Sequence, residues 1–271
     1  MHAEIFPVFE TKNLTKVCCR TLYLYLIKES PHFQFLIYDR IHCFPFTAKD
    51  SSVYSNPAYS RYAHVFQKRK KTLKESLGVL DLFSGIGSGT VVLKKLRIPL
   101  RKVVHVEHDP VAVNVSKFNH QNDGIDHVYI STFEEIYGED DEGDPDKIAN
   151  FIIEHGPFEL VLSAAPCKHY SQVNAFRNKT AYTAQYLLKA GKMIKMINAI
   201  QKEYLDVKND IMFLSENVVF PDNDAICKCY GDSMGGLCPI ELDACDFSPC
   251  KRKRFYWTNV SIQAIYIFHD L

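Results

Sequence analysis

The sequence predicts an α/β fold built on a doubly wound, mostly parallel β-sheet. From residue 78 onward, short apolar runs typical of buried strands alternate with segments of helical periodicity. A glycine-rich turn follows the first run, and polar residues follow several of the others. This alternation indicates a Rossmann-like sheet, in which binding sites lie at the carboxyl ends of the strands.

The predicted elements divide the chain into an irregular N-terminal segment, 1–77, and a main domain, 78–271. Asp109 and Pro110 suit the N-terminus of the second helix, and the long helix 183–204 has apolar residues at helical spacing. The last two runs alternate aromatic and polar residues, as hairpin strands do. In order, we predict strand 79–83, helix 88–97, strand 102–106, helix 110–120, strand 127–130, helix 146–155, strand 158–163, helix 183–204, strand 211–214 and a closing hairpin of 254–257 with 262–268.

Size and composition are those of a soluble globular protein. The 271 residues can form one large core or one core with a small appendage, and 46% hydrophobic content excludes a disordered chain. No apolar run is long enough to cross a bilayer, and the N-terminus lacks a secretory pattern. The acidic stretch 134–146, which also contains glycines and a proline, predicts a solvated loop. We therefore expect no membrane association.

The cysteines predict free thiols and no metal site. Nine is an odd number, and the irregular spacing indicates a reducing intracellular compartment. The paired two-residue gaps of common zinc sites are missing from the C-terminal group, Cys227, Cys229, Cys238, Cys245 and Cys250.

The first candidate site is the turn Phe83-Ser84-Gly85-Ile86-Gly87-Ser88-Gly89. Glycine lets the backbone turn sharply and come close to a ligand. Glu107 ends the next predicted strand, where an acid can accept hydrogen bonds from both ribose hydroxyls. The pattern indicates a nucleotide site, although dinucleotide enzymes share it and a purely structural turn would look the same.

The second candidate is the thiol of Cys167, which follows Pro166 shortly after predicted strand 158–163. The polar segment after it, with Asn174 and Arg177, predicts a mobile loop that places a thiolate against a substrate. The alternative is a buried cysteine that acts only as a small apolar group.

Two charged groups complete the candidate residues. Glu216 follows strand 211–214, and partial burial there would raise its pKa and let it share a proton with a ring nitrogen. Arg252 and Arg254 project to the same side of an extended chain and could bind carbonyl and phosphate oxygens. The alternatives are a surface acid and a basic patch or nuclear-import signal.

In this order the four groups resemble the motifs of the DNA (cytosine-5) methyltransferases, and the resemblance covers residues 78–260. Two segments look most like the de novo, animal-type branch, namely Gly156-Pro157-Phe158-Glu159-Leu160-Val161 and Ser171-Gln172-Val173-Asn174-Ala175-Phe176-Arg177-Asn178-Lys179. The resemblance implies an S-adenosylmethionine-dependent methyltransferase that acts on DNA in the nucleus.

Carried over by position, the resemblance makes Cys167 the nucleophile that attacks carbon 6 of a flipped-out cytosine. Glu216 would protonate the ring nitrogen, and Arg252 and Arg254 would hold the base. Substrate contacts would come from Asn174 and Arg177. S-adenosylmethionine would bind to Phe83, Ser84, Gly85, Ile86, Gly87, Ser88, Glu107 and Leu187.

The chain departs from this family's pattern in two places. Residues 129–133 offer no acid for the adenine amino group before Glu134. Only residues 259–271 follow Thr258, where the family has a target-recognition segment and a last motif, so we expect a catalytic domain truncated at its C-terminus. Two alternatives stay open: a silent homologue that binds an active methyltransferase subunit, and methylation of cytosine in transfer RNA.

Overall fold

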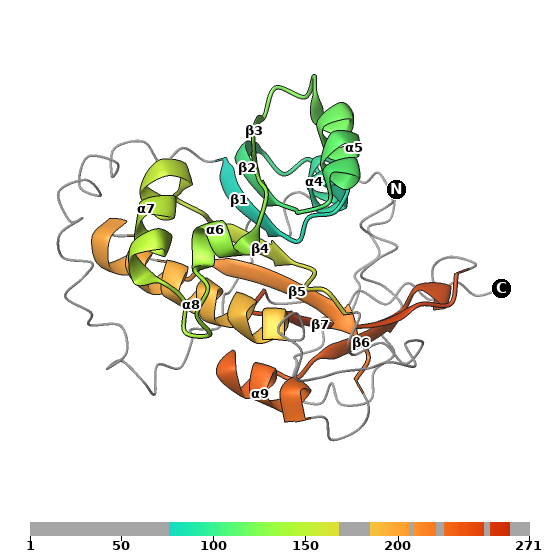
Figure 1. Cartoon of the computed structure of the whole chain (residues 1–271). Helices are drawn as coiled ribbons and strands as arrows, with labels where there is room; N and C mark the ends of the chain where they lie inside the picture. Colours follow the sequence, from blue (N-terminus) through green and yellow to red (C-terminus); the bar gives the residue numbers. More distant parts are fainter. Residues whose placement is uncertain are drawn as a thin grey trace, which may run out of the picture.

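The apolar runs form a seven-stranded sheet in the order β3-β2-β1-β4-β5-β7-β6 in the computed structural model (Figure 1). The structure describes residues 76–167, 185–205, 207, 209–220, 225–246 and 250–260. The strands are β1 (Leu77–Leu82), β2 (Leu100–Val106), β3 (Asp126–Ile130), β4 (Leu160–Ser163), β5 (Met212–Val218), β6 (Ile240–Asp243) and β7 (Lys253–Thr258). Neighbours among β1 to β5 are parallel, and β7 is antiparallel to β5 and β6. The predicted mostly parallel α/β sheet is confirmed.

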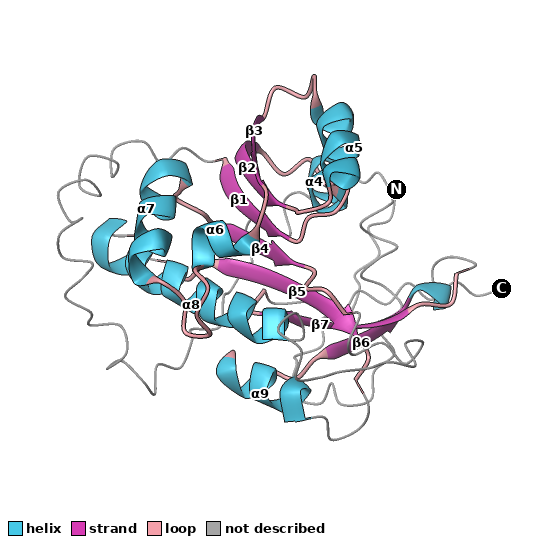
Figure 2. Cartoon of the chain, in the orientation of Figure 1, coloured by secondary structure: helices cyan, strands magenta, loops and turns pink. Residues whose placement is uncertain are grey.

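Helices cover both faces of the sheet (Figure 2). On one face Val79 and Val103 pack with Leu93 of the first helix, and on the other Leu80 and Leu82 join the larger core formed with α7 and α8. Neighbouring residues of a strand point to opposite faces, which is why these strands are apolar throughout. The helices are α4 (Ser88–Lys95), α5 (Pro110–His120), α6 (Phe133–Tyr137), α7 (Pro145–His155), α8 (Tyr186–Leu205) and α9 (Ala225–Ser233), with a short 3₁₀ helix, η5 (Ala244–Asp246).

Local sequence signals placed the helix boundaries well. Helix α5 begins at Pro110, and the carboxylate of Asp109 accepts a hydrogen bond from the backbone N–H of Val111 at 2.9 Å, as an N-cap does. Helix α8 covers the predicted long amphipathic segment and buries Met193 and Ile197 completely. Both helices therefore form where capping residues and apolar spacing predict them.

The acidic stretch 134–146 is more ordered than predicted. Helix α6 occupies its first part and begins with a capping box. Asp144 caps α7 by accepting hydrogen bonds from two backbone N–H groups. Asp141 and Glu142 form ion pairs with lysines of α8 at 3.1 and 2.7 Å. The prediction of a solvated loop is confirmed for residues 138–144, of which 139–142 are exposed, but it was wrong for the two ends of the stretch, which belong to α6 and α7.

The predicted closing hairpin is replaced by a different one. Strand β7 pairs with β5 on one side and with β6 on the other, so both of its edges are occupied between Arg254 and Tyr256. The predicted partner of 254–257 was therefore wrong, and residues 262–268 themselves lie outside the described residues. Strand β6 escaped prediction because its four residues, with two acids, give too weak a pattern.

The N-terminal segment stays a prediction, since residues 1–75 lie outside the described part of the chain. Strand β1 begins at Leu77, one residue before the predicted boundary of the main domain. Among the described residues, no helix combines the length and the apolar character that a membrane span requires.

Candidate functional site

The register of the sheet brings the ends of β1, β2 and β4 to one level, together with Ser215 inside β5. Leu82 at the end of β1 is paired with Val106 of β2 and with Ser163 of β4, and Ser163 is paired with Ser215 of β5. The residues that follow these positions therefore start from the same level of the sheet. Because the sheet order reverses between β1 and β4, this edge is where a doubly wound sheet binds its ligand.

The glycine turn after β1 has a backbone shape that leaves space for a ligand. Gly85 has a φ of 54°, and a Cβ added there would meet no atom within 4 Å. Gly87 has a φ of 77°, and a Cβ there would lie 2.5 Å from the Ser116 hydroxyl and 2.7 Å from His120 Nε2. The first glycine faces open space and the second faces α5, so each is needed for a different reason.

Glu107 fastens the turn to the end of β2. Its Oε2 accepts a hydrogen bond from the backbone N–H of Gly85 and its Oε1 accepts one from Asp109, both at 2.9 Å. The side chain is 10% exposed. A carboxylate offers about four lone-pair positions, so these two bonds leave Glu107 capacity to accept from a bound hydroxyl.

An aromatic wall stands beside the turn, and the sequence analysis missed it as a unit. The ring of Phe83 lies 5.3 Å from that of Phe133 and 5.4 Å from that of Tyr186, measured between centroids. The Tyr186 hydroxyl donates a hydrogen bond to Glu134 at 2.6 Å. The wall joins the end of β1, helix α6 and the start of α8, segments whose meeting only the fold reveals.

The thiol lies just beyond the end of β4. Pro166 and Cys167 are half-buried, and Cys167 packs against the main core. The buried side chain of Asn217, in β5, donates a hydrogen bond to the carbonyl of Ala165 at 3.2 Å. This bond ties the segment that carries the thiol to the strand that carries Glu216, and Asn217 is a positioning residue that the sequence analysis did not assign.

Glu216 forms an ion pair with Arg254 across the β5–β7 ladder, with 2.7 Å between Oε1 and Nε. Burial raises the Glu216 pKa, and the charges of Arg254 and Arg252 only partly oppose this. The exposed fractions of the Glu216 and Arg254 side chains are 25% and 19%. Arg252 lies just before β7 and is exposed. The acid is therefore held by a guanidinium and keeps its proton to a higher pH than a free glutamate.

Comparison with known proteins gives a partial match. No family model matches the chain. The DNA (cytosine-5)-methyltransferases DRM2 and DRM1 of Arabidopsis thaliana are 30% and 32% identical to it over 107 and 108 residues. Each match covers 39% of this chain and 16% of the relative, so the chain spans about one sixth of the length of these relatives. Because both are plant enzymes, they support a relation to methyltransferases but not the predicted closeness to the animal-type branch.

Solved structures resemble the chain only loosely. The Dnmt2 methyltransferase of S. pombe is 19% identical with a TM-score of 0.44, covering 72% of this chain and 51% of the other. A SAM-dependent methyltransferase from Agrobacterium tumefaciens is 14% identical with a TM-score of 0.40, covering 75% and 62%. At these scores the likeness carries no argument of its own, and the fold rests on the strand order and register of this chain.

The structure does not test two of the predicted site residues, and it buries a third. Asn174 and Arg177 lie outside the described residues. Leu187 is 1% exposed and belongs to the main core. The glycine turn, Glu107 and Cys167 follow the ends of β1, β2 and β4, Arg254 lies on β7 and Arg252 just before it. Glu216 was predicted to follow a strand that ends at Leu214, but it lies within β5, because pairing with β7 extends that strand to Val218.

Proposed function

We propose that this chain uses S-adenosylmethionine to methylate carbon 5 of cytosine in DNA. The observation that carries the proposal is the shared edge of the sheet, where the glycine turn and Glu107 stand beside the end of β4, which leads to Cys167, and beside β5, which carries Glu216. The first pair of features suits a nucleotide cofactor, and the second suits covalent attack on a base. The similarity to the Arabidopsis DNA (cytosine-5)-methyltransferases supports the same assignment.

The residues of the turn fit this cofactor. The Ser84 hydroxyl is buried without a hydrogen-bond partner among the described residues, and Gly85 faces open space. Glu107 would accept hydrogen bonds from the ribose hydroxyls, and the Phe83 ring would offer an apolar surface. Ile86 and Ser88 complete the turn, while Leu187 would support it from the core. The bound cofactor would supply an electrophilic methyl group.

The chain's own residues would activate the base. The Cys167 thiolate would form a bond from Sγ to carbon 6 of cytosine, and the displaced electron pair would make carbon 5 nucleophilic. Glu216 would give its proton to ring nitrogen 3, so that the ring does not carry the extra negative charge. As carbon 5 bonds to the methyl group, the electron pair of the broken bond would stay on the cofactor sulfur, and a water molecule would then take the carbon-5 proton. The electrons of that C–H bond would restore the ring double bond and expel the Cys167 thiolate, while ring nitrogen 3 would return its proton to Glu216.

The arginines and the segment after Cys167 would hold the substrate. Arg254 keeps Glu216 in place through its ion pair and, with Arg252, would steady the base. Asn174 and Arg177 are proposed contacts to the flipped base or its backbone. DNA is then the partner, and the nucleus the proposed location, because that is where chromosomal DNA lies. The Cys167 thiolate could reach carbon 6 only after the base has been flipped out of the duplex.

Replacing Glu107 by glutamine is expected to raise the Kd for S-adenosylmethionine about 10- to 100-fold, because a hydrogen bond to a charged group is worth about 1.5–3 kcal/mol. The amide nitrogen of glutamine also cannot accept a bond from a backbone N–H. Isothermal titration measures the Kd. Glu154→Gln, at an exposed acid of α7, is the matched control and should bind as the wild type does. An unchanged Kd in Glu107→Gln would place the cofactor elsewhere.

The proposed function is tested by incubating the wild-type chain with methyl-labelled S-adenosylmethionine and either duplex DNA or transfer RNA. Label in 5-methylcytosine of DNA, identified after digestion to nucleosides, is the expected result. Label in transfer RNA instead would show that the base chemistry is right and the polymer wrong. Cofactor binding without transfer to either polymer would contradict the enzyme assignment and favour the silent homologue that acts through an active subunit.

A further inference from the structure

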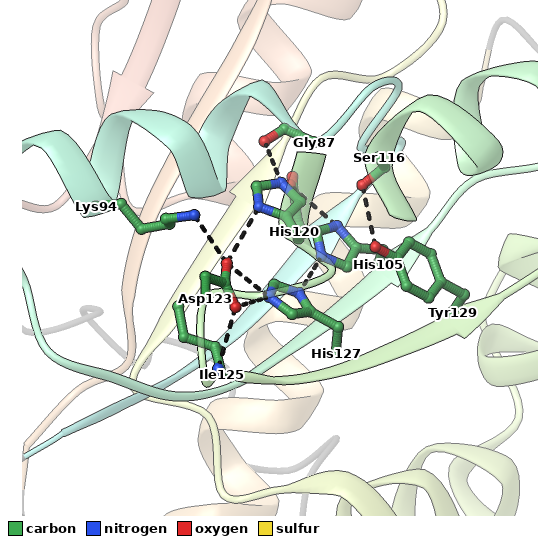
Figure 3. A network of polar contacts seen from close by, with 10 residues as sticks. Gly87, Lys94, His105, Ser116, His120, Asp123, Ile125, His127 and Tyr129 are labelled. Atoms are coloured by element: carbon green, nitrogen blue, oxygen red, sulfur yellow. Dashed lines mark hydrogen bonds and ion pairs between the residues drawn. The ribbon is translucent and has the colours of Figure 1, made fainter. Parts of the chain in front are cut away.

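Behind the glycine turn lies a cluster of three histidines and an aspartate that the proposed reaction does not use (Figure 3). His105 comes from β2, His120 ends α5, Asp123 lies in the turn after it, and His127 belongs to β3. The three imidazole rings stack with centroids 4.9, 5.2 and 5.9 Å apart. Imidazole and carboxylate groups seldom gather in a protein core, because each buried polar atom needs a hydrogen-bond partner or a bound ion.

The spacing of three of these side chains is that of metal ligands. His120 Nδ1 lies 3.3 Å from Asp123 Oδ2, and His127 Nε2 lies 3.2 Å from each Asp123 oxygen. One ligand atom from each residue can be chosen so that all lie within 4.8 Å of one another. Bonds of about 2.0–2.1 Å to a tetrahedral zinc ion put its ligand atoms roughly 3.3 Å apart. The distances between these side chains therefore leave room for an ion with little movement.

The ring of His120 has a buried nitrogen to which a metal ion could bind. This residue is 3% exposed, and its Nδ1 has no hydrogen-bond partner among the described residues. Its Nε2 lies 3.3 Å from the carbonyl of Gly87, to which an Nε2–H can donate. In that tautomer a lone pair on Nδ1 faces the Asp123 carboxylate, and two lone pairs at this distance repel unless a cation lies between them.

The surroundings of His127 and Asp123 suit metal ligation. His127 Nδ1 lies 3.0 Å from His105 Nε2, and an outer hydrogen bond of this kind orients a ligand histidine. Asp123 accepts hydrogen bonds from the Lys94 ammonium at 2.9 Å and from the backbone N–H of Ile125 at 3.1 Å, so its carboxylate is held in a fixed orientation.

We propose that His120, Asp123 and His127 form a binding site for a divalent transition metal, with Zn²⁺ as the ion that best matches two imidazoles and one carboxylate. His105 is a positioning residue that fixes the His127 ring. Lys94 donates a hydrogen bond to Asp123 Oδ2 and the Ile125 N–H donates one to Oδ1, so each carboxylate oxygen keeps a lone pair for the ion. The site stands on the geometry of these side chains and does not depend on the methyltransferase proposal.

The proposal is tested on the full chain by stripping it with a chelator, adding Zn²⁺ and removing the unbound ion by dialysis. Elemental analysis is expected to find one equivalent more zinc in the wild type than in His120→Gln or Asp123→Asn. The melting temperature of the wild type should rise on adding Zn²⁺, whereas those of the two variants should not. Asp126→Asn, at an exposed carboxylate three residues away, is the matched control and should behave as the wild type does.

Co²⁺ in place of Zn²⁺ distinguishes this site from a thiol site, because thiolate ligands produce a charge-transfer band that imidazole and carboxylate ligands do not. The site is supported if Co²⁺ bound to the wild type shows no such band and if Asp123→Asn does not bind this Co²⁺. Equal metal content in the wild type and in both variants, or no retained metal in the wild type, overturns it. A variant that fails to fold leaves the wild-type content and the other variant to decide.

Discussion

Replacement of Cys167 by alanine is expected to abolish methyl transfer to DNA, with a loss of at least about 10⁴-fold in rate, because no other group can take over from a missing nucleophile. Binding of S-adenosylmethionine should persist, since the glycine turn and Glu107 belong to other strand ends. Transfer of labelled methyl groups to duplex DNA measures the first effect, and isothermal titration measures the second. Retained transfer in Cys167→Ala would rule out the covalent mechanism.

Cys227→Ala is the matched control for this variant. Cys227 is also half-buried and packs against the same core as Cys167, so its removal costs similar packing without touching the candidate site. We expect normal transfer in Cys227→Ala. A comparable loss in both variants would mean that the effect comes from a weakened core.

Glu216→Gln is expected to reduce methyl transfer about 10²- to 10⁴-fold, the usual contribution of a positioned acid. Glutamine keeps the size of the side chain and can donate a hydrogen bond to the ring nitrogen, but it cannot give up a proton. The loss should appear in kcat. Glu241→Gln is the matched control, because Glu241 is an exposed acid of β6 that pairs with Lys253 of β7. Equal effects in both variants would argue against proton transfer by Glu216.

The pH profile provides a second measurement of the same residue. Burial raises the Glu216 pKa, so the protonated form needed for donation persists to a higher pH than for a free glutamate. Wild-type activity should therefore fall as the pH rises through the raised Glu216 pKa and this form is depleted. In Glu216→Gln this fall at high pH should disappear. A high-pH fall that survives in the variant would belong to another group.

Sequence patterns predicted the parts of this protein that local chemistry decides. The Asp109-Pro110 step marks the start of α5 because a capping carboxylate and a fixed φ act within one turn. The ends of β1, β2 and β4 were also predictable, since buried runs of branched residues stop there and polar residues begin. The positions of the glycine turn and Glu107 followed from their places after parallel strands. Strand β5, in contrast, was predicted to end at Leu214 but continues to Val218, because pairing with β7 extends it through Glu216.

The unpredicted parts depend on contacts between distant segments. The wall of Phe83, Phe133 and Tyr186 needs the end of β1 to meet α6 and α8. Strand β6 depends on pairing with β7, which no local pattern reveals. The histidine cluster did have a local signal in the spacing of His120, Asp123 and His127, but His105 joins it only through the β2–β3 register.

The reversal of strand order between β1 and β4 has a consequence for how this protein can change. The turn and Glu107 belong to the β1–β2 half of the sheet, whereas Cys167, Glu216 and Arg254 belong to the β4–β5–β7 half. Loss of one half's chemistry therefore does not require loss of the other. A related protein could lose the residues that activate the base yet keep those that bind the cofactor. Substitutions could likewise alter one half of the sheet without changing the residues of the other half.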